Sequence, residues 1–476
     1  MRRLVAVSNR TSSALGSQAG GLAVAVGEAL VETGGLWFGW SGEISADKPR
    51  GVRMFSEGGI DYAVSDLTED EHDHYYLGYA NRALWPIVHY RVDLAVFHEE
   101  DFAAYEAVNQ RFARLLRPQL RPDDIVWIQD YHFFMLGDDL RREGWDGPIG
   151  FFLHTPFPAP EIFKAVPEHA RLARALCSCD LIGFQTEQDA ENFRRYLTHE
   201  HGGVEREDGT VEVFNTVVRA QAHPIGIDAE DFTQLTQSEG AISACKKIER
   251  FIGERDLIIG VDRMDYSKGL PQRFEAVSQL FVHHPEFRGK VSFTQIAPPS
   301  RSKVEEYQEL RLELNELAGQ INGEYGDLDW IPIRYLARSY RRDELSGLLR
   351  VARIGLVTPL RDGMNLVAKE YVAAQDPEDP GVLVLSRFAG AADQLEAAVQ
   401  INPYDPSSMA DDLKTALTMP LEERKARHAS LLENVKTHDV QWWRKGFLDA
   451  LDAACADAKA ASDRVNRASR PVEIAS

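Results

Sequence analysis

The stretch Ile354-Gly-Leu-Val-Thr-Pro-Leu-Arg-Asp-Gly-Met-Asn-Leu-Val-Ala-Lys-Glu370 decides the fold class. It opens with a short apolar run, passes through a charged loop, and continues as a helix that is apolar on nearly all sides. A run that is apolar throughout is typical of a parallel strand covered on both faces. The segment therefore predicts one strand–loop–helix unit of an α/β fold.

The same alternation of short apolar runs and helical patterns extends along the chain and predicts parallel sheets in both halves. In the first half, strands are expected at Leu4–Ser8, Ile125–Gln129, Ile149–Leu153, Leu181–Gln185 and Val217–Ala222. In the second half, they are expected at Leu257–Val261, Val291–Ile296, Trp330–Tyr335, Ile354–Thr358 and Val382–Leu385. A sandwich or barrel of hairpins is disfavoured, because helices interrupt the runs.

A polar, acidic segment after Pro224-Ile-Gly-Ile227 marks a domain boundary. We therefore predict two similar α/β domains, residues 1–228 and 229–447, with a crevice between them. Residues 448–476 are expected to form a C-terminal helix and tail that packs back on the first domain.

Composition limits the classes of partner. The chain has 476 residues and a formal net charge of −21, which disfavours sequence-independent nucleic-acid binding and docking on anionic membranes. The four cysteines show neither a CxxC pair nor a metal-finger spacing, and no apolar run is long enough for a secretory signal or a membrane span. We expect a soluble, cytoplasmic protein with no nucleic-acid or membrane partner.

Charged or titratable side chains follow six of the predicted strands, and ligands of open parallel sheets bind beyond the carboxyl ends of the strands. For any one of these residues a solvated loop charge is the commoner explanation. Their joint occurrence in both halves predicts an anion-binding site in the crevice. The six are Arg10, Asp130, His154, Arg263, Arg301 and Asp362, with Lys268 shortly after Arg263.

Two segments have the chemistry of a nucleotide-diphosphate site. Arg263 and Lys268 lie five residues apart on a loop and can clamp adjacent phosphates, although a surface loop salt-bridged to Asp262 or Asp265 is the alternative. Glu370 lies roughly 7.5 Å along the helix axis from the start of its helix. A diphosphate bound at the amide groups of the helix N-terminus would place its attached ribose near that depth, where Glu370 could accept two ribose hydroxyls. A structural ion pair is the alternative for Glu370.

Glycines and aromatic residues add weaker signals. The segment Gly16–Leu22 follows the first strand and opens a helix, but it is not the GxGxxG fingerprint, which disfavours a dinucleotide-dependent oxidoreductase. Aromatic side chains, which suit a sugar ring although core packing is commoner for any one of them, cluster at Trp37, Trp40, Tyr75, Tyr76 and Trp85.

Assembled in order, these segments resemble the bacterial trehalose-6-phosphate synthases, a family of retaining glycosyltransferases of the GT-B class, over roughly residues 1–450. The matching motifs include Val7-Ser-Asn-Arg10, Gly20-Gly21-Leu22, Trp37-Phe-Gly-Trp40, Leu84-Trp85-Pro86, Trp127-Ile-Gln-Asp130-Tyr-His132, Phe152-Leu-His154-Thr-Pro-Phe-Pro158, Arg263-Met-Asp-Tyr-Ser-Lys268, Ile296-Ala-Pro-Pro-Ser-Arg301, Ile321-Asn-Gly-Glu-Tyr-Gly326 and the run Val357 to Gln375.

The resemblance implies a GT-B fold, with two Rossmann-like domains facing each other across a deep cleft. It implies transfer of glucose from a nucleotide-diphosphate glucose, UDP-glucose by default, to glucose 6-phosphate. The product is α,α-trehalose 6-phosphate, within osmoprotectant trehalose biosynthesis and the stress response. It also implies a homo-oligomer.

Residue roles also follow from the resemblance. Arg10, Tyr76, Asp130 and Arg301 would hold the acceptor, with the two arginines on its phosphate. The donor nucleotide would be held by Gly20, Gly21, Arg263, Lys268, Tyr340, Leu366, Val367, Ala368, Lys369 and Glu370. His154 and Asp362 would bind hydroxyls of the donor glucose, and Trp85 and Thr155 match positions tied to choice of the acceptor anomer. The catalytic set is then Arg263, Lys268, His154, Asp362 and Asp130.

The chemistry suggests front-face attack, in which the leaving phosphate deprotonates the acceptor hydroxyl and the two cations stabilise the departing charge. We expect no metal and no cofactor, because no Asp-x-Asp motif lines the predicted site. Two alternatives stay open: a pseudo-glycosyltransferase that couples cyclitol-like rings, and a catalytically silent regulatory subunit that binds sugar nucleotides.

Overall fold

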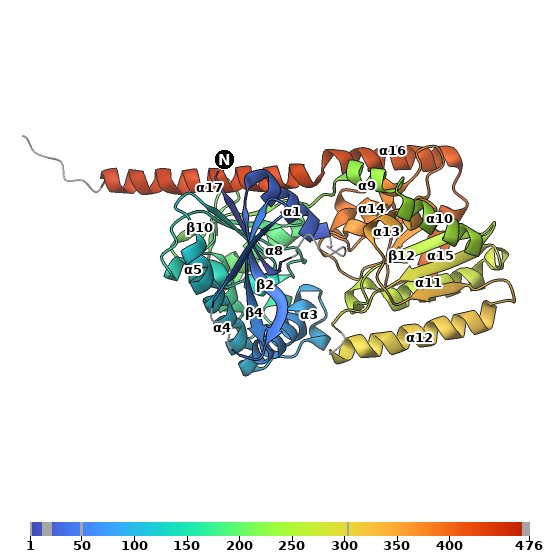
Figure 1. Cartoon of the computed structure of the whole chain (residues 1–476), viewed down its shortest axis with the longest axis horizontal. Helices are drawn as coiled ribbons and strands as arrows, with labels where there is room; N and C mark the ends of the chain where they lie inside the picture. Colours follow the sequence, from blue (N-terminus) through green and yellow to red (C-terminus); the bar gives the residue numbers. More distant parts are fainter. Residues whose placement is uncertain (1, 12–20, 48–50, 302–303, 469–476) are drawn as a thin grey trace, which may run out of the picture.

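The computed structural model of the chain describes residues 2–11, 21–47, 51–301 and 304–468. Two α/β lobes lie side by side, and one long helix extends along the first of them (Figure 1). Each lobe is built on its own sheet, in agreement with the α/β fold expected from the sequence.

The first lobe contains an eight-stranded sheet of order β11-β7-β6-β5-β1-β2-β4-β3, parallel except for the edge strand β3. Its strands are β1 Leu4–Arg10, β2 Leu36–Ser45, β3 Arg53–Glu57, β4 Ile60–Thr68, β5 Ile125–Gln129, β6 Ile149–Phe152, β7 Leu181–Phe184 and β11 Ala220–Ala222. β2, β3 and β4 were not predicted, because their apolar positions are interrupted by Gly42, Glu43 and other polar residues.

The prediction of one strand over Val217–Ala222 is wrong. β10 (Thr216–Val218) pairs with β9 (Val211–Val213) in a small antiparallel sheet that also holds β8 (Val204–Glu205), whereas β11 joins the main sheet. Arg219 separates the two strands, and its carbonyl accepts the amide of Ile182 at 2.9 Å.

The second lobe contains a six-stranded parallel sheet of order β14-β13-β12-β15-β16-β17. Its strands are β12 Asp256–Val261, β13 Val291–Ile296, β14 Ile333–Leu336, β15 Ile354–Val357, β16 Val382–Ser386 and β17 Val399–Ile401. The prediction that a strand begins at Trp330 is wrong, because Trp330 pairs locally with Asp327 and its indole donates to the carbonyl of Val291 at 2.8 Å.

Helices cover both sheets. They are α1 Gly21–Thr33, α2 Glu69–Glu71, α3 Trp85–Val88, α4 Glu99–Leu116, α5 Leu136–Arg142, α6 Pro160–Phe163, α7 His169–Leu176, α8 Glu187–His201, α9 Ala229–Leu235, α10 Glu239–Ile252, α11 Leu270–His283, α12 Glu305–Tyr325, α13 Arg342–Arg350, α14 Leu366–Ala374, α15 Pro406–Leu417, α16 Leu421–Thr437 and α17 Val440–Ala468. A π-helix, η1 (His72–Leu84), precedes α3. In the described part of the chain, none of the helices is long and apolar enough to cross a membrane.

The chain passes between the lobes twice, near Gly226 and near His438, and the two crossings touch. A Cβ atom on Gly226 would lie 2.2 Å from the carbonyl oxygen of His438, so a side chain at this position is excluded. After the second crossing, α17 returns along the first lobe (Figure 1). The rings of Trp443 and Phe447 pack on Trp127 of β5, with centroids 4.9 and 5.0 Å away.

These two α17 residues fall within the predicted second domain, 229–447, although they contact the first sheet. The domain limits at residues 228 and 447 therefore stay a prediction. The contacts favour placing the second limit near Val440.

Candidate active site

A cavity of about 820 Å³ opens between the two lobes, and both lobes line it. Its basic groups include Arg10 from the first lobe and Arg263, Lys268 and Arg301 from the second. Further predicted site residues in the wall are Tyr76, Trp85, Asp130, His154, Tyr340, Asp362, Leu366, Val367 and Glu370. The predicted basic groups thus line one cavity, and anion binding there stays a prediction.

The wall is assembled from the carboxyl ends of parallel strands, where their loops converge. Three non-glycine residues in it have positive φ angles: Asp130 at 73°, Arg301 at 45° and Asn365 at 78°. Positive φ angles are uncommon for non-glycine residues, although Asp and Asn adopt them more often than Arg, and strained backbone concentrates at functional sites. This observation supports a binding role for the cavity.

On the first-lobe side, buried aromatic residues hold the basic groups. The Arg301 guanidinium lies 4.0 Å from the centroid of the Trp85 ring, and its Nη2 donates to the Tyr131 hydroxyl at 3.1 Å. Arg10 lies over the Trp40 ring at 5.9 Å. The π-helix η1 carries Tyr76, whose ring is tilted against Trp40 at 5.6 Å. Of the aromatic cluster in the sequence, Tyr76 and Trp85 line the cavity, whereas Trp37 and Tyr75 are core residues.

Asp130 follows β5 and lies against the next loop of the first lobe. Its Oδ1 accepts the amide of His154 at 3.2 Å. Burial raises the pKa of Asp130 to about 6, although backbone amides of Tyr131, His154 and Thr155 oppose the rise. Asp130 is therefore a carboxylate near neutral pH, suited to accept hydroxyl hydrogen bonds.

His154 is neutral, and its tautomer follows from two glutamines. The Gln185 carbonyl oxygen accepts the amide of Ile225 at 3.0 Å, so its Nε2 must be the donor toward His154 Nδ1 at 3.3 Å. His154 Nε2–H then donates to Gln129 Oε1 at 2.8 Å. Burial lowers the pKa of His154 to about 3, which keeps this arrangement intact over the physiological range.

On the second-lobe side, Lys268 forms an ion pair with Asp362. Lys268 Nζ lies 2.5 Å from Asp362 Oδ2, which also accepts from Asn365 Nδ2 at 3.0 Å. Burial would raise the pKa of Asp362, but Lys268 and the hydrogen bonds hold it below its ordinary value. Lys268 is thus not a solvated surface charge, and a bound diphosphate would compete with Asp362 for it.

The helix α14 begins at this loop. Asn365 caps it, because its Oδ1 accepts the amide of Ala368 at 3.2 Å. In the described part of the chain, neither a hydrogen bond nor an ion pair reaches the Glu370 carboxylate. Burial raises the pKa of Glu370 to about 7, opposed weakly by Arg342. The structure therefore disagrees with the alternative of a structural ion pair and leaves Glu370 facing the cavity.

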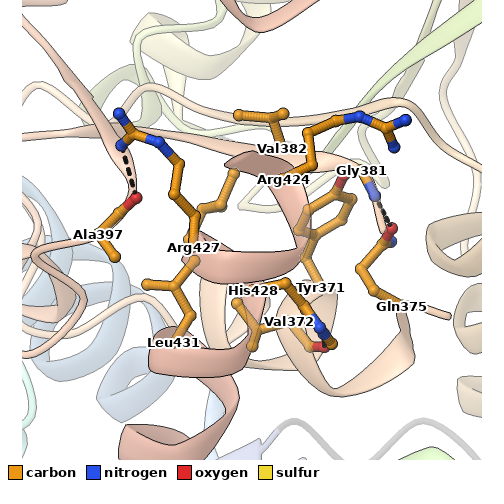
Figure 2. Close-up of a pocket in the computed structure, with 11 residues that line it drawn as sticks. Tyr371, Val372, Gln375, Gly381, Val382, Ala397, Arg424, Arg427, His428 and Leu431 are labelled. Atoms are coloured by element: carbon orange, nitrogen blue, oxygen red, sulfur yellow. Dashed lines mark hydrogen bonds between the residues drawn. The ribbon is translucent and has the colours of Figure 1, made fainter. Parts of the chain in front are cut away.

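The opposite face of α14 is packed against α16 (Figure 2). His428 of α16 hydrogen-bonds the carbonyl of Val372 at 3.0 Å, the Arg424 side chain lies beside Tyr371, and Leu431 lies next to Arg427 across the small void. The void that remains there is about 10 Å³, no more than the room one water needs. Packing against α16 therefore fixes the position of α14.

Thr155, Ala368 and Lys369, which were predicted as site residues, lie away from the cavity wall. Gly20 is outside the described residues, and Gly21 is the first residue of α1. Thr155 and Ala368 are buried beneath the wall. Lys369 is fully buried, and its Nζ donates to the Ile225 carbonyl and to Gln394 Oε1, both at 2.7 Å.

Other wall residues were missed by reasoning from the sequence. Gln129 and Gln185 are neutral and gave no signal of charge, although both end predicted strands. Arg342 stands beside Glu370 and opens α13, a helix whose start was not predicted. In the described residues there is no cluster of three or more His, Cys, Asp or Glu side chains able to hold a metal ion.

Two parallel-sheet lobes that face each other across a cavity, with basic groups from both in its wall, have the GT-B architecture of glycosyltransferases. The chain belongs to glycosyltransferase family 20, whose family model matches residues 2–453. A trehalose-6-phosphate synthase from Sinorhizobium fredii is 46% identical over 459 residues, which cover 95% of this chain and 99% of that protein.

Solved structures agree with this family. An α,α-trehalose-phosphate synthase (UDP-forming) from Burkholderia xenovorans, in complex with glucose-6-phosphate, matches with a TM-score of 0.92 and 46% identity, covering 94% of this chain and 100% of that one. An E. coli protein bound with UDP-2-fluoro glucose matches with a TM-score of 0.91 and 44% identity, covering 94% and 98%.

Proposed function

We propose that the protein transfers glucose from UDP-glucose to glucose 6-phosphate with retention, releasing UDP and α,α-trehalose 6-phosphate. The observation that carries this proposal is the convergence of Arg10 and Arg301 with Arg263 and Lys268 on one cavity. That arrangement suits two phosphorylated substrates side by side. The ligands of the two solved relatives, glucose-6-phosphate and UDP-2-fluoro glucose, support the same pair.

In this scheme, each side of the cavity has a distinct task. Arg10, Tyr76, Asp130 and Arg301 bind the acceptor, and Arg263, Lys268 and the start of α14 bind the donor. The cations of Arg263 and Lys268 stabilise the negative charge that grows on the leaving diphosphate. The acceptor hydroxyl passes its proton to the leaving phosphate, so that neither Asp130 nor Asp362 has to form a covalent bond to the sugar.

The test is a donor panel of UDP-, GDP- and ADP-glucose with glucose 6-phosphate, in which NMR identifies the product and its anomeric configuration. We expect the fastest transfer from UDP-glucose and an α,α-linkage. Reactions run with EDTA should keep their rate, because no metal is required. A strict divalent-ion requirement would overturn the metal-free scheme, and absence of any glucosyl transfer would favour the regulatory alternative. Coupling of a cyclitol-like acceptor in place of glucose 6-phosphate would favour the pseudo-glycosyltransferase.

We also propose that the protein is cytoplasmic and forms homo-oligomers. The four cysteines are free, as is usual in a reducing compartment. The homo-oligomer rests on the family resemblance. Light scattering on the purified protein measures the oligomeric state.

A further inference from the structure

Asp265 lies on the loop between Arg263 and Lys268, and its side chain is fully buried. The two oxygens of its carboxylate serve different parts of the cavity. Oδ1 accepts the amide of Ser267 at 3.0 Å and faces the indole nitrogen of Trp85 at 3.4 Å. Oδ2 faces Arg301 Nη1 at 3.3 Å and accepts the Tyr307 hydroxyl at 3.1 Å. One carboxylate thus contacts both lobes.

On the acceptor side, Asp265 fixes the direction of the Arg301 guanidinium. Arg301 Nη1 also donates to the Tyr307 hydroxyl, and Nη2 donates to Tyr131. Among the described residues these contacts use three of the five N–H groups of the guanidinium, so one on Nη2 and the one on Nε remain for a phosphate. Without an anion at residue 265, nothing in this cluster would balance the buried charge of Arg301.

On the donor side, Asp265 forms the turn that carries Lys268. It caps the short 3-10 helix Tyr266–Lys268 through the amide of Ser267, and its own carbonyl accepts the amide of Lys268 at 3.0 Å. Gly269 then turns the chain with a φ of 61° into α11. The position of the Lys268 ammonium near Asp362 therefore depends on this cap.

Electrostatics keep the group ionised. Burial would raise the pKa of Asp265, but Arg301, Arg263 and nearby cationic groups hold it well below its ordinary value. Asp265 is consequently a permanent negative charge shared by the acceptor-phosphate arginine and the donor loop.

We propose that Asp265 is a positioning residue that orients Arg301 for the acceptor phosphate and, through a separate hydrogen bond, the Lys268 turn for the donor diphosphate. The inference rests on the proposed transfer reaction. It predicts that the two functions of the carboxylate can be separated by substitution, because they use different oxygens.

The experiment compares Asp265→Asn with Asp265→Ala by steady-state kinetics with both substrates varied. Asn has one amide oxygen, and when that oxygen accepts the Ser267 amide, the NH₂ group, a donor, takes the place of Oδ2 against Arg301. We expect D265N to raise the KM for glucose 6-phosphate at least about tenfold, the effect of losing one charged hydrogen bond, and to leave the KM for UDP-glucose within about twofold. D265A should raise both KM values.

Asp124→Asn is the matched control, because Asp124 is equally buried and accepts from the Arg3 guanidinium and from a backbone amide, that of Arg121 at 2.7 Å, outside the cavity. D124N should lower the melting temperature without separating the two KM values. If D265N folds poorly, Tyr307→Phe tests the Oδ2 side, with a severalfold rise expected in the KM for glucose 6-phosphate alone.

Three results would overturn the inference: an unchanged KM for glucose 6-phosphate in D265N and Y307F, equal rises for both substrates in D265N, or the same separation in D124N. The wild-type protein in the same assay tests the proposed function independently, because its failure to transfer glucose would refute the reaction whatever the variants do.

Discussion

Glu370 should make donor binding depend on pH. Its carboxylate faces the cavity with a pKa raised by burial to about 7, so it loses its charge as the pH falls through neutrality. Its ionised fraction is about 0.9 at pH 8 and about 0.1 at pH 6, from the titration of a single group. If the ribose hydroxyls donate to the carboxylate, the affinity for UDP should fall about tenfold between these pH values, or about 1.4 kcal/mol.

Isothermal titration of UDP into the wild-type protein and into Glu370→Gln measures this effect. The diphosphate itself titrates near pH 6, but it does so equally with both proteins, and the difference between their slopes isolates Glu370. We expect weaker, flatter binding for E370Q, with the two proteins nearest each other at pH 6. If UDP affinity changes with pH by the same slope in both proteins, the assignment of Glu370 is refuted. It is also refuted if the UDP affinity of the wild-type protein rises as the pH falls, because a protonated Glu370 would then be the better partner for the ribose.

Two further outcomes test the leaving-group chemistry and the role of α17. Lys268→Ala should lower kcat by roughly 10²–10³-fold, because it removes a cation from the departing diphosphate. Lys247 is exposed, and Lys247→Ala should leave kcat unchanged. Near-normal kinetics for K268A would remove Lys268 from the catalytic set. Trp443→Ala should lower the free energy of unfolding in urea by about 3–5 kcal/mol, because Trp443 is fully buried on Trp127. Trp442→Ala, at a neighbouring side chain that is 43% exposed, should lower it by less than about 1 kcal/mol. Equal losses in the two variants would contradict the packing of α17 on the first lobe.

Periodicity predicted the strands that are buried on both faces, because their residues are apolar throughout. β2 was missed for the opposite reason: it starts as Leu36-Trp-Phe-Gly-Trp40 and then turns polar at Ser41, so that half of it carries no strand signal. The break of Val217–Ala222 into two strands of different sheets is a tertiary choice, which local propensity cannot reveal.

Charged wall residues could be predicted because the carboxyl ends of parallel strands meet at one edge. The sequence did not predict which way each charged side chain of a helix points. Lys369 and Glu370 are neighbours in sequence, yet the Glu370 carboxylate faces the cavity, whereas Lys369 is fully buried and its ammonium donates to the Ile225 carbonyl. Burial there lowers the pKa of Lys369 to about 7, as expected for an ammonium held by neutral oxygens.

Neutral residues around the first crossing connect the parts of the two lobes that carry the charged wall residues. Ile225 donates its amide to Gln185, which sets the tautomer of His154, and its carbonyl accepts Lys369 of α14. The peptide groups of Ile225, at the first crossing, are therefore hydrogen-bonded to Gln185 of the first lobe and to Lys369 of the second. Any rotation of one lobe against the other must displace Gln185 or Lys369 relative to Ile225, so the geometry of His154 and of α14 cannot be independent of the angle between the lobes. No pattern of charge or periodicity in the sequence contains that coupling, because it depends on backbone groups that every residue has.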